Sequence, residues 1–195
     1  MDRLHKLPLD GFGNLETTDD FLNARGYRAI DDDVISMADK TRLHGGLVRA
    51  SEENPPHETA VCAFDNKGMA TKWLASHDFI IPEDRKRPWL EYRLRADCPQ
   101  AKLKKYTLTS ASDFPERDPS HIKVECWNDR NRTWTVLHEQ DNINFPARGH
   151  QLEFEVAPGH NHFSRRFRLC ILNVRDSQRA DCVQLSEWHL YSTEN

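Results

Sequence analysis

A short loop rich in oxygen-bearing groups carries the most suggestive chemistry of this sequence. Segment 63–73 holds one carboxylate, one hydroxyl and one glycine before a large aromatic residue; these are Asp65, Thr71, Gly68 and Trp73. Carboxylate, hydroxyl and carbonyl oxygens are the ligands that hard cations prefer, and Gly68 lets the backbone turn its carbonyls inward. The loop therefore predicts a cation site anchored by a buried tryptophan. The alternative is an ordinary turn in which Asp65 bonds to its own backbone.

A second loop, residues 113–119, combines an arginine with three acidic side chains. Planar hydrogen-bonding groups of this kind bind sugar hydroxyls, while an aromatic face packs on the apolar side of a sugar ring. The predicted ligand-binding residues are Asp113, Glu116, Arg117, Asp118 and, as an outward-facing aromatic, Trp127. Two alternatives remain open. Arg117 pairs with Asp113 or Asp118 and closes the loop, and the N-terminal segment covers Trp127.

Alternating apolar and polar residues predict β-strands from Leu47 onward. A period of two matches half-buried antiparallel strands, and Pro- and Gly-bearing loops separate them. The inward-facing sets are Leu90, Tyr92 and Leu94; Ile122, Val124 and Cys126; and Phe167, Leu169 and Ile171. Glu91 and Arg93 take the outer face of their strand. We therefore predict an all-β fold, a two-sheet antiparallel β-sandwich.

The last strand breaks its own alternation. Leu185, Trp188 and Leu190 all suit the core, yet Leu185 and Trp188 are an odd number of residues apart. Only an irregularity between them lets both point inward, so we predict a β-bulge near Ser186 and Glu187. A bulge redirects a side chain, and here it frees the oxygens of Glu187 for a neighbouring loop.

The first 45 residues differ in character from the rest. Residues 17–26 have a polar cap, acids in the first turn and a terminal glycine, which predicts a short helix. Acids also begin segment 31–40, where we expect a second helical turn. The chain thus divides into a partly helical N-terminal extension, 1–45, and a sandwich domain, 46–195. We expect the extension to pack on the sandwich or cover a sheet edge, with peptide binding as the alternative.

Composition limits the classes of partner. The 195 residues are 30% charged with a net charge of −4, which argues against nucleic acid. No apolar run is long enough to cross a bilayer, and the N-terminus lacks the apolar core of a secretory signal. We therefore expect a cytoplasmic protein without membrane insertion. The five cysteines cannot all pair and match no zinc or dithiol motif, so we expect free, mostly buried thiols.

Motifs of catalysis are absent from the sequence. It contains no phosphate loop, no Gly-x-Ser-x-Gly and no His-Glu-x-x-His, and none of its cysteines stands in a recognisable nucleophile context. We predict a binding protein and not an enzyme.

Four segments occur in the order found in one known family: residues 89–94, 106–111, 122–126 and 185–190. Together they resemble the discoidin, or coagulation factor V/VIII C-type, domain. This domain is a galactose-binding-like jelly roll, and family 32 carbohydrate-binding modules share the pattern. Residues 109–119, followed by Asn128, Asp129 and Trp134, look most like modules of glycan-processing enzymes, including some peptide N-glycanases. The resemblance spans residues 47–191.

The resemblance implies a non-catalytic glycan-binding module in which Glu187 lies beside the Asp65 loop at a structural calcium. The predicted calcium ligands are Phe64, Asp65, Gly68, Thr71 and Glu187, with Phe64 and Gly68 giving carbonyl oxygens. Two features depart from the family. Asn66 stands where many relatives have glycine, although Asn tolerates a left-handed backbone, and Lys67 places a cation near the site.

The expected partner is a glycan or glycoprotein. Because the N-terminal extension has no match in the family and the cysteines cannot all pair, an intracellular protein–protein interaction scaffold on the same sandwich is the alternative function. In that case the extension binds the partner protein.

Overall fold

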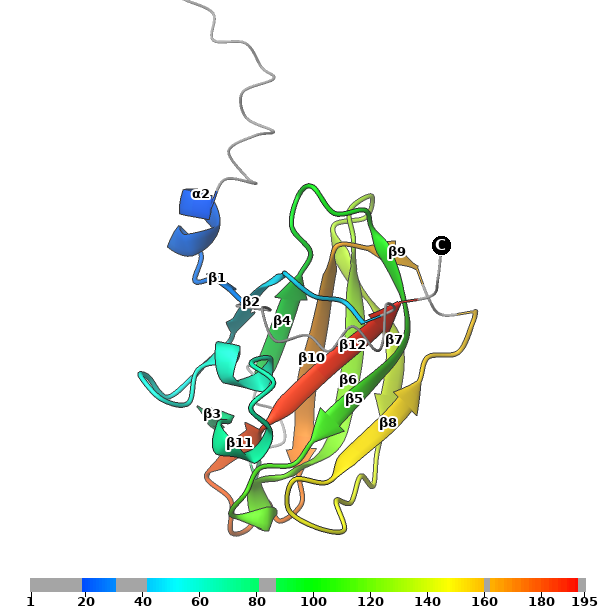
Figure 1. Ribbon diagram of the computed structural model, residues 1–195. Helices are drawn as coiled ribbons and strands as arrows, with labels where there is room; N and C mark the ends of the chain where they lie inside the picture. The colour runs from blue at the N-terminus through cyan, green and yellow to red at the C-terminus, as the bar shows by residue number, and fades with distance from the viewer. Residues whose placement is uncertain (1–18, 31–41, 81–86, 160–161, 193–195) are drawn as a thin grey trace, which may run out of the picture.

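Strands with one apolar face make up most of the described chain, which comprises residues 19–30, 42–80, 87–159 and 162–192 of the computed structural model. The single described α-helix and the strands appear in Figure 1. Their bounds are α2 Asp19–Ala24, β1 Arg28–Ala29, β2 Leu47–Ala50, β3 Trp73–Ser76, β4 Trp89–Arg93, β5 Ala101–Thr109, β6 Pro119–Asn128, β7 Thr133–Gln140, β8 Gln151–Glu155, β9 Phe163–Ser164, β10 Arg166–Val174, β11 Cys182–Leu185 and β12 Glu187–Ser192. Three short 3₁₀ turns are η1 Ala60–Ala63, η2 Gly68–Ala70 and η3 Pro115–Arg117.

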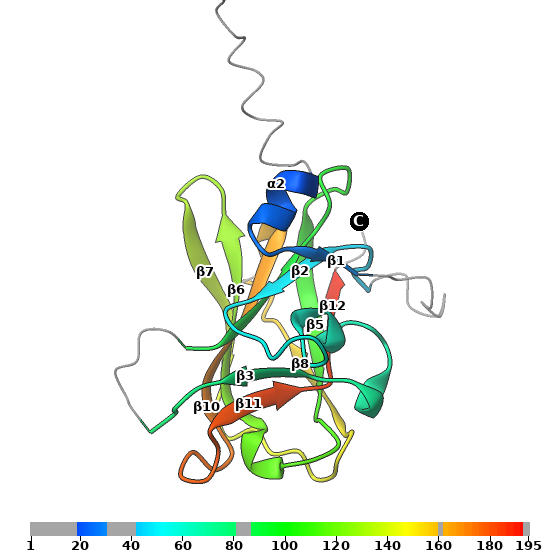
Figure 2. The ribbon, with the colours of Figure 1, turned by 90° about the vertical axis from the view of Figure 1, so that its left-hand side faces the viewer.

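Two antiparallel layers enclose the core. One is a six-stranded sheet in the order β1-β2-β4-β10-β6-β7, and the other has the order β12-β5-β8, with β9 also pairing with β5. Strands β11 and β3 form a separate pair, which crosses the lower part of the molecule in Figure 2. The predicted all-β, two-sheet antiparallel sandwich is confirmed.

The core contains the residues that the alternation placed inward. All nine members of the three predicted sets are buried. Trp73 is also fully buried, as its loop predicts, and its indole nitrogen donates to the carbonyl of Glu52 at 2.9 Å. Trp188 lies against Phe64, with ring centroids 5.6 Å apart. Burying such large aromatic rings contributes to the stability of this fold.

The described part of the N-terminal segment joins the edge of the larger sheet. Helix α2 falls within the predicted 17–26, and β1 pairs with β2, placing Arg28 opposite Val48. Leu22, Tyr27 and Leu47 form a small apolar cluster below it. The second helical turn predicted at 31–40 lies outside the described residues.

The break in the last strand is a change of sheet, so the predicted bulge is wrong. Leu185 ends β11 opposite Trp73, and Glu187 begins β12 opposite Thr109. Ser186 is the bend between them, and its N–H donates to the carbonyl of Thr109 at 3.0 Å. Because the chain passes from one sheet to the other, consecutive residues can all be buried without violating the two-residue period.

Glu91 is fully buried, although its position on the outer face predicts exposure. Tyr27, Arg49, Arg166 and Arg168 cover its carboxylate and donate to it; the Arg49, Arg166 and Arg168 contacts are 2.9, 2.7 and 3.1 Å. Burial alone raises the pKa of this carboxyl. The hydrogen bond and charge of Arg166, aided by Arg49 and Tyr27, outweigh burial and hold the pKa at about 2.

Guanidinium groups and aromatic rings alternate across the outer face of the six-stranded sheet. Arg168 lies between the indoles of Trp89 and Trp134, at 4.3 and 3.9 Å from their centroids. Arg166 lies 4.7 Å from the ring of Trp127, and Arg49 lies 4.4 Å from that of Tyr27. Each contact is an attractive cation–π interaction, so the side chains of this face are held in fixed positions.

The five cysteines are free thiols, and Cys126 and Cys182 are buried. No helix of the described chain is both long and apolar enough to cross a membrane.

We expect Glu91→Ala to lower the free energy of unfolding by about 3–5 kcal/mol, because it leaves three guanidinium groups without their buried partner. The matched control is Glu153→Ala, which removes a half-exposed partner of Lys105 and should cost at most about 1 kcal/mol. Urea unfolding monitored by tryptophan fluorescence measures both. Equal losses in the two variants would show that the buried cluster contributes no more than a surface pair.

Candidate functional site

The loop between β5 and β6 holds an exposed aromatic ring in an unusual backbone conformation. Phe114 has φ 38° and ψ 71°, in the left-handed region, and is 48% exposed. Pro115 follows it at the start of η3, where a fixed φ suits the turn. A non-glycine residue in this region is uncommon and persists only when its surroundings hold it there.

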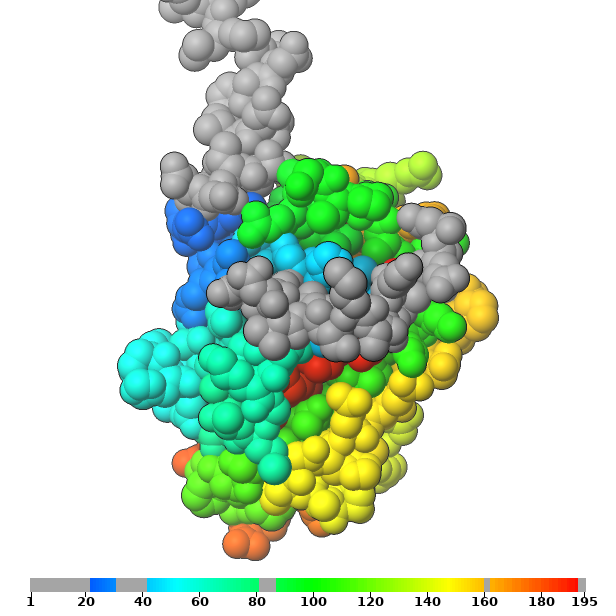
Figure 3. All heavy atoms as spheres, in the orientation of Figure 1, coloured from blue at the N-terminus to red at the C-terminus, as the bar shows by residue number. Residues whose placement is uncertain are grey.

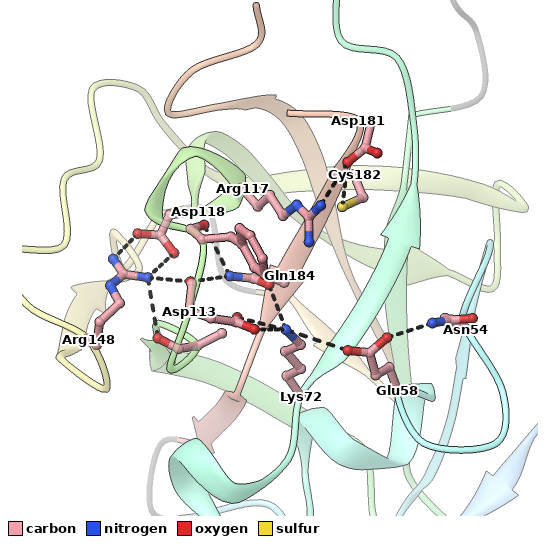
Figure 4. A network of polar contacts seen from close by, with 12 residues as sticks. Asn54, Glu58, Lys72, Asp113, Arg117, Asp118, Arg148, Asp181, Cys182 and Gln184 are labelled. Atoms are coloured by element: carbon pink, nitrogen blue, oxygen red, sulfur yellow. Dashed lines mark hydrogen bonds and ion pairs between the residues drawn. The ribbon is translucent and has the colours of Figure 1, made fainter. Parts of the chain in front are cut away.

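Gln184 of β11 supplies that constraint from the interior. Its fully buried side chain donates to the carbonyls of Asp113 and Phe114, at 2.6 and 3.2 Å. Its own carbonyl oxygen accepts a hydrogen bond from Lys72 at 3.0 Å. Figure 4 shows the amide at the centre of this network. A buried amide with its donors and acceptor satisfied fixes the backbone of the loop.

Lys72 ties the loop to the start of β3. Its ammonium group lies 2.7 Å from both carboxylate oxygens of Asp113 and 3.5 Å from Glu58. The lysine side chain is largely buried and Asp113 is partly exposed. One oxygen-rich face of Asp113 therefore remains open to solvent.

Arg117 pairs with a loop that is distant in sequence. Its guanidinium carbon lies 4.2 Å from the centroid of the Phe114 ring, and its Nη2 lies 3.1 Å from Asp181. The Cys182 thiol donates to the same carboxylate at 3.2 Å, and this hydrogen bond lowers the pKa of Asp181. Burial raises the pKa of Cys182 to about 12, so this sulfur remains a thiol and is a poor nucleophile.

Asp118 is a structural anchor and not an accessible ligand. Its carboxylate is 1% exposed and forms two hydrogen bonds with Arg148, one of them 2.8 Å long. Arg148 also donates to the carbonyl of Asp113 at 3.3 Å. The alternative in which Arg117 pairs with Asp113 or Asp118 is wrong. Lys72 and Arg148 bind those two carboxylates, and Arg117 pairs with Asp181 instead. Glu116 is half-buried, and its carbonyl accepts the N–H of Asp176 at 3.1 Å.

Trp127 belongs to a different surface from the other four candidates. It lies near the end of β6, about 26 Å along the strand from Pro119 at a rise of about 3.3 Å per residue. Its ring packs at 5.4 Å against that of Trp134, its cross-strand partner. The five predicted ligand-binding residues therefore do not form one site.

A hollow of about 660 Å³ adjoins the Arg117 loop. The residues after β3 and those before β11 line it; they include Ser76, His77, Asp78, Gln178 and Asp181. Asp181 thus faces both the hollow and Arg117. Figure 3 shows these loops, at 110–118 and before β11, next to each other at the lower end of the molecule. We call Phe114, Arg117, Asp181 and this hollow the loop-end site.

The loop predicted to bind calcium does meet Glu187, but through donor groups. Glu187 accepts the backbone N–H of Gly68 at 2.9 Å, while its own backbone remains in the β12–β5 ladder. Asp65 accepts the N–H of Lys67 and the hydroxyl of Thr71, at 3.1 and 2.8 Å. Asn66 has φ 59°, the left-handed turn expected for it.

This arrangement does not fit Ca²⁺, which takes about six to eight oxygen ligands at roughly 2.3–2.6 Å. The Gly68 N–H, and not its carbonyl, faces Glu187, and the Lys67 ammonium lies 3.5 Å from Asp65. Among the described residues no group of three or more His, Cys, Asp or Glu side chains is arranged to hold a metal. Hydrogen bonds close this loop.

Sequence reasoning missed several residues of the loop-end site and of the contacts that hold it. Phe114 carried a signal, because an aromatic residue before Pro115 lies within the loop already selected. Lys72, Asp181 and Gln184 carried none, since their roles depend on contacts with loops at least 41 residues away.

The fold is the galactose-binding-like β-sandwich of F5/8 type C domains and family 32 carbohydrate-binding modules. The F5/8 type C domain of a Bacteroides fragilis protein matches with a TM-score of 0.60 and 15% identity, covering 87% of this chain and 98% of that one. The family 32 module of NanJ from C. perfringens, in complex with galactose, has a TM-score of 0.54 and 11% identity, covering 74% and 92%. A second Clostridium perfringens module, in complex with GalNAc-β-1,3-galactose, has a TM-score of 0.56 and 15% identity over 74% and 94%. No protein-family model matches the chain.

One curated protein is similar in sequence. It is the peptide-N(4)-(N-acetyl-β-glucosaminyl)asparagine amidase of Arabidopsis thaliana, which is 32% identical over 168 residues. The match covers 85% of this chain but only 22% of the amidase. The chain therefore corresponds to about a fifth of that enzyme's length.

We expect Gln184→Ala to loosen the β5–β6 loop, because it removes two donors to loop carbonyls and the acceptor of Lys72. Amide hydrogen exchange at residues 113–117 should become faster, and stability should fall by about 1–3 kcal/mol. The exposed Gln151, replaced by alanine, is the control and should leave these amides unchanged. Unchanged protection in Gln184→Ala would show that the loop is held by other contacts.

We expect calcium to leave the thermal midpoint unchanged, because the Asp65 and Glu187 carboxylates already accept hydrogen bonds from the 65–71 loop. Calcium and chelator samples should differ by less than about 1 °C, well under 1 kcal/mol for a chain of this size. Differential scanning calorimetry provides the measurement. A saturable rise with calcium that is lost in Glu187→Gln would establish a metal site instead.

Proposed function

We propose that the chain is a non-catalytic glycan-binding module whose sugar lies on Phe114 in the loop-end site. The single observation that carries the proposal is the half-exposed Phe114 ring, whose backbone Gln184 fixes and over which lies Arg117, itself paired with Asp181. A rigid aromatic face beside planar charged groups matches the apolar face and equatorial hydroxyls of a sugar ring.

The polar groups beside Phe114 suit hydroxyl recognition. The Asp181 side chain is 82% exposed, so its carboxylate can accept from hydroxyls while Arg117 donates to them. The exposed part of Asp113 adds acceptor oxygens on the other side of the loop. Because these groups already hold one another in place, little conformational entropy is lost on binding.

The adjoining hollow gives room for more than one sugar residue. Its volume of about 660 Å³ lies within the usual range of ligand pockets, roughly 300–1,000 Å³. His77, Asp78 and Gln178 supply further donors and acceptors along its wall.

Catalysis is not part of the proposal. The Cys182 thiol, which lies at the site, has a raised pKa of about 12 and donates to Asp181, so it does not supply a thiolate. The similarity to part of an amidase that by its name acts on glycosylated asparagine agrees with a role in holding the glycan. Solved proteins of the same fold with bound galactose also support a sugar ligand.

We expect Phe114→Ala to weaken glycan binding at least about tenfold, since loss of about 1.4 kcal/mol of stacking is a factor of ten. A glycan array of galactosides, GalNAc glycans and high-mannose N-glycans identifies the best ligand, and isothermal titration calorimetry compares the variants.

The matched control is Phe163→Ala, which removes another exposed phenylalanine, in β9, that lies under the cation of Lys102. Its affinity should equal that of the wild type, and a thermal melt of each variant checks folding. Absence of any glycan ligand, or equal affinity of Phe114→Ala and the wild type, would refute the proposal.

A further inference from the structure

A second hollow lies on the outer face of the six-stranded sheet, with a volume of about 580 Å³. Strand register explains it. Trp89 of β4 is paired with Cys170 of β10, which is paired with Lys123 of β6. Because the cysteine side chain is shorter than the indole and lysine side chains on either side of it, a trough forms across the three strands. We call this hollow the sheet-face trough.

Cations surround the trough. Arg87, Lys123 and Arg168 line it, and among the described lining residues Glu52 alone carries a carboxylate. The acidic side chains beneath are already used. Glu91 is fully buried under its donors, and Glu125, which is 7% exposed, accepts from Lys123 at 2.9 Å. An incoming group therefore meets positive charge at this surface of an acidic protein.

The Cys170 thiol at the floor of the trough is uncharged. The Cys170 thiol donates to Glu125 at 3.3 Å, and burial together with that carboxylate raises the pKa of Cys170 to about 12. The thiol therefore keeps its proton and adds no negative charge to the floor.

The walls are held in advance. Arg168 is stacked between two indoles and bonded to Glu91, and Arg87 lies 5.6 Å from the ring of Phe79. Cationic groups that do not have to be ordered on binding cost less entropy when they meet an anion. The Trp89 indole beside them offers an apolar face for a ring that carries the anion.

We propose that the sheet-face trough binds a sugar residue carrying an anionic group: a phosphate, a sulfate or a carboxylate. The proposal deepens the glycan function and rests on it for the sugar part of the ligand. Glu52 lines both the sheet-face trough and the loop-end hollow, so the two are neighbours along the surface. One acidic oligosaccharide can then extend from the loop-end hollow into the sheet-face trough, with its charged residue beside Lys123.

The test uses the full chain labelled with ¹⁵N and titrated at constant ionic strength. Inorganic phosphate is the first probe, followed by three matched sugar pairs: mannose with mannose 6-phosphate, galactose with galactose 6-sulfate, and glucose with glucuronic acid. The indole N–H resonance of Trp89 should shift saturably with phosphate. Each acidic sugar should bind at least about tenfold more tightly than its neutral partner. Comparison among the three acids distinguishes the source of the anion.

Lys123→Gln and Arg87→Gln should each weaken phosphate binding about threefold to fivefold, the effect of losing one partly exposed ion pair. Two variants are used because Lys123 also supports Glu125, and circular dichroism checks the folding of each. Lys102→Gln is the matched control; its cation lies 4.7 Å from the Phe163 ring, outside the trough, and should not alter binding.

No saturable shift at Trp89, or equal binding of acidic and neutral sugars, would overturn the proposal. Unaltered phosphate affinity in both Lys123→Gln and Arg87→Gln would also overturn it. If Phe114→Ala abolishes neutral-glycan binding but leaves the phosphate shift, the trough is supported as a separate subsite. If phosphate binds while no glycan of any kind does, the glycan function fails and so does the sugar part of this proposal.

Discussion

The pairing of one buried carboxylate with three guanidinium groups organises one whole face of this molecule. Glu91 sits in the middle strand of three and receives Arg49 from β2 and Arg166 and Arg168 from β10. Fixed in this way, the guanidiniums order the indoles beside them, and Glu91 itself accepts the hydrogen bond of the Tyr27 hydroxyl. The outer surface of the sheet, the docking of the N-terminal segment and the sheet-face trough therefore all depend on a single ionised group that has no contact with water.

The loop-end site is held by a different kind of interaction, centred on a neutral side chain. There the neutral amide of Gln184, which is buried, donates hydrogen bonds to backbone carbonyls of the loop. Lys72 and Arg148 form ion pairs with the acidic side chains of the loop. The arginine at the tip is left with a highly exposed partner, Asp181. Buried hydrogen bonds and ion pairs therefore hold the loop rigid, while its accessible polar groups face the solvent. A preorganised binding site requires this arrangement.

The local sequence pattern was enough to predict the strands and their inner faces, because the two-residue period is visible in alternate residues such as Leu90, Tyr92 and Leu94. The sequence did not reveal which residues lie opposite each other across strands and loops. The burial of Glu91 depends on the register of β4 with β2 and β10, and the partner of Arg117 lies 64 residues away. The separation of Trp127 from the Arg117 loop could have been predicted from the sequence, because a ten-residue strand spans about 30 Å.

The change of sheet at Ser186 also affects how the protein folds during synthesis. Strand β3 gains its only described partner from β11, and the inner edge of β5 is covered by β12. Both partners leave the ribosome more than seventy residues after β5. Until residues 182–192 emerge, the two layers have unpaired strand edges and an uncovered apolar face, so the nascent chain has a long interval in which these surfaces are open to other chains.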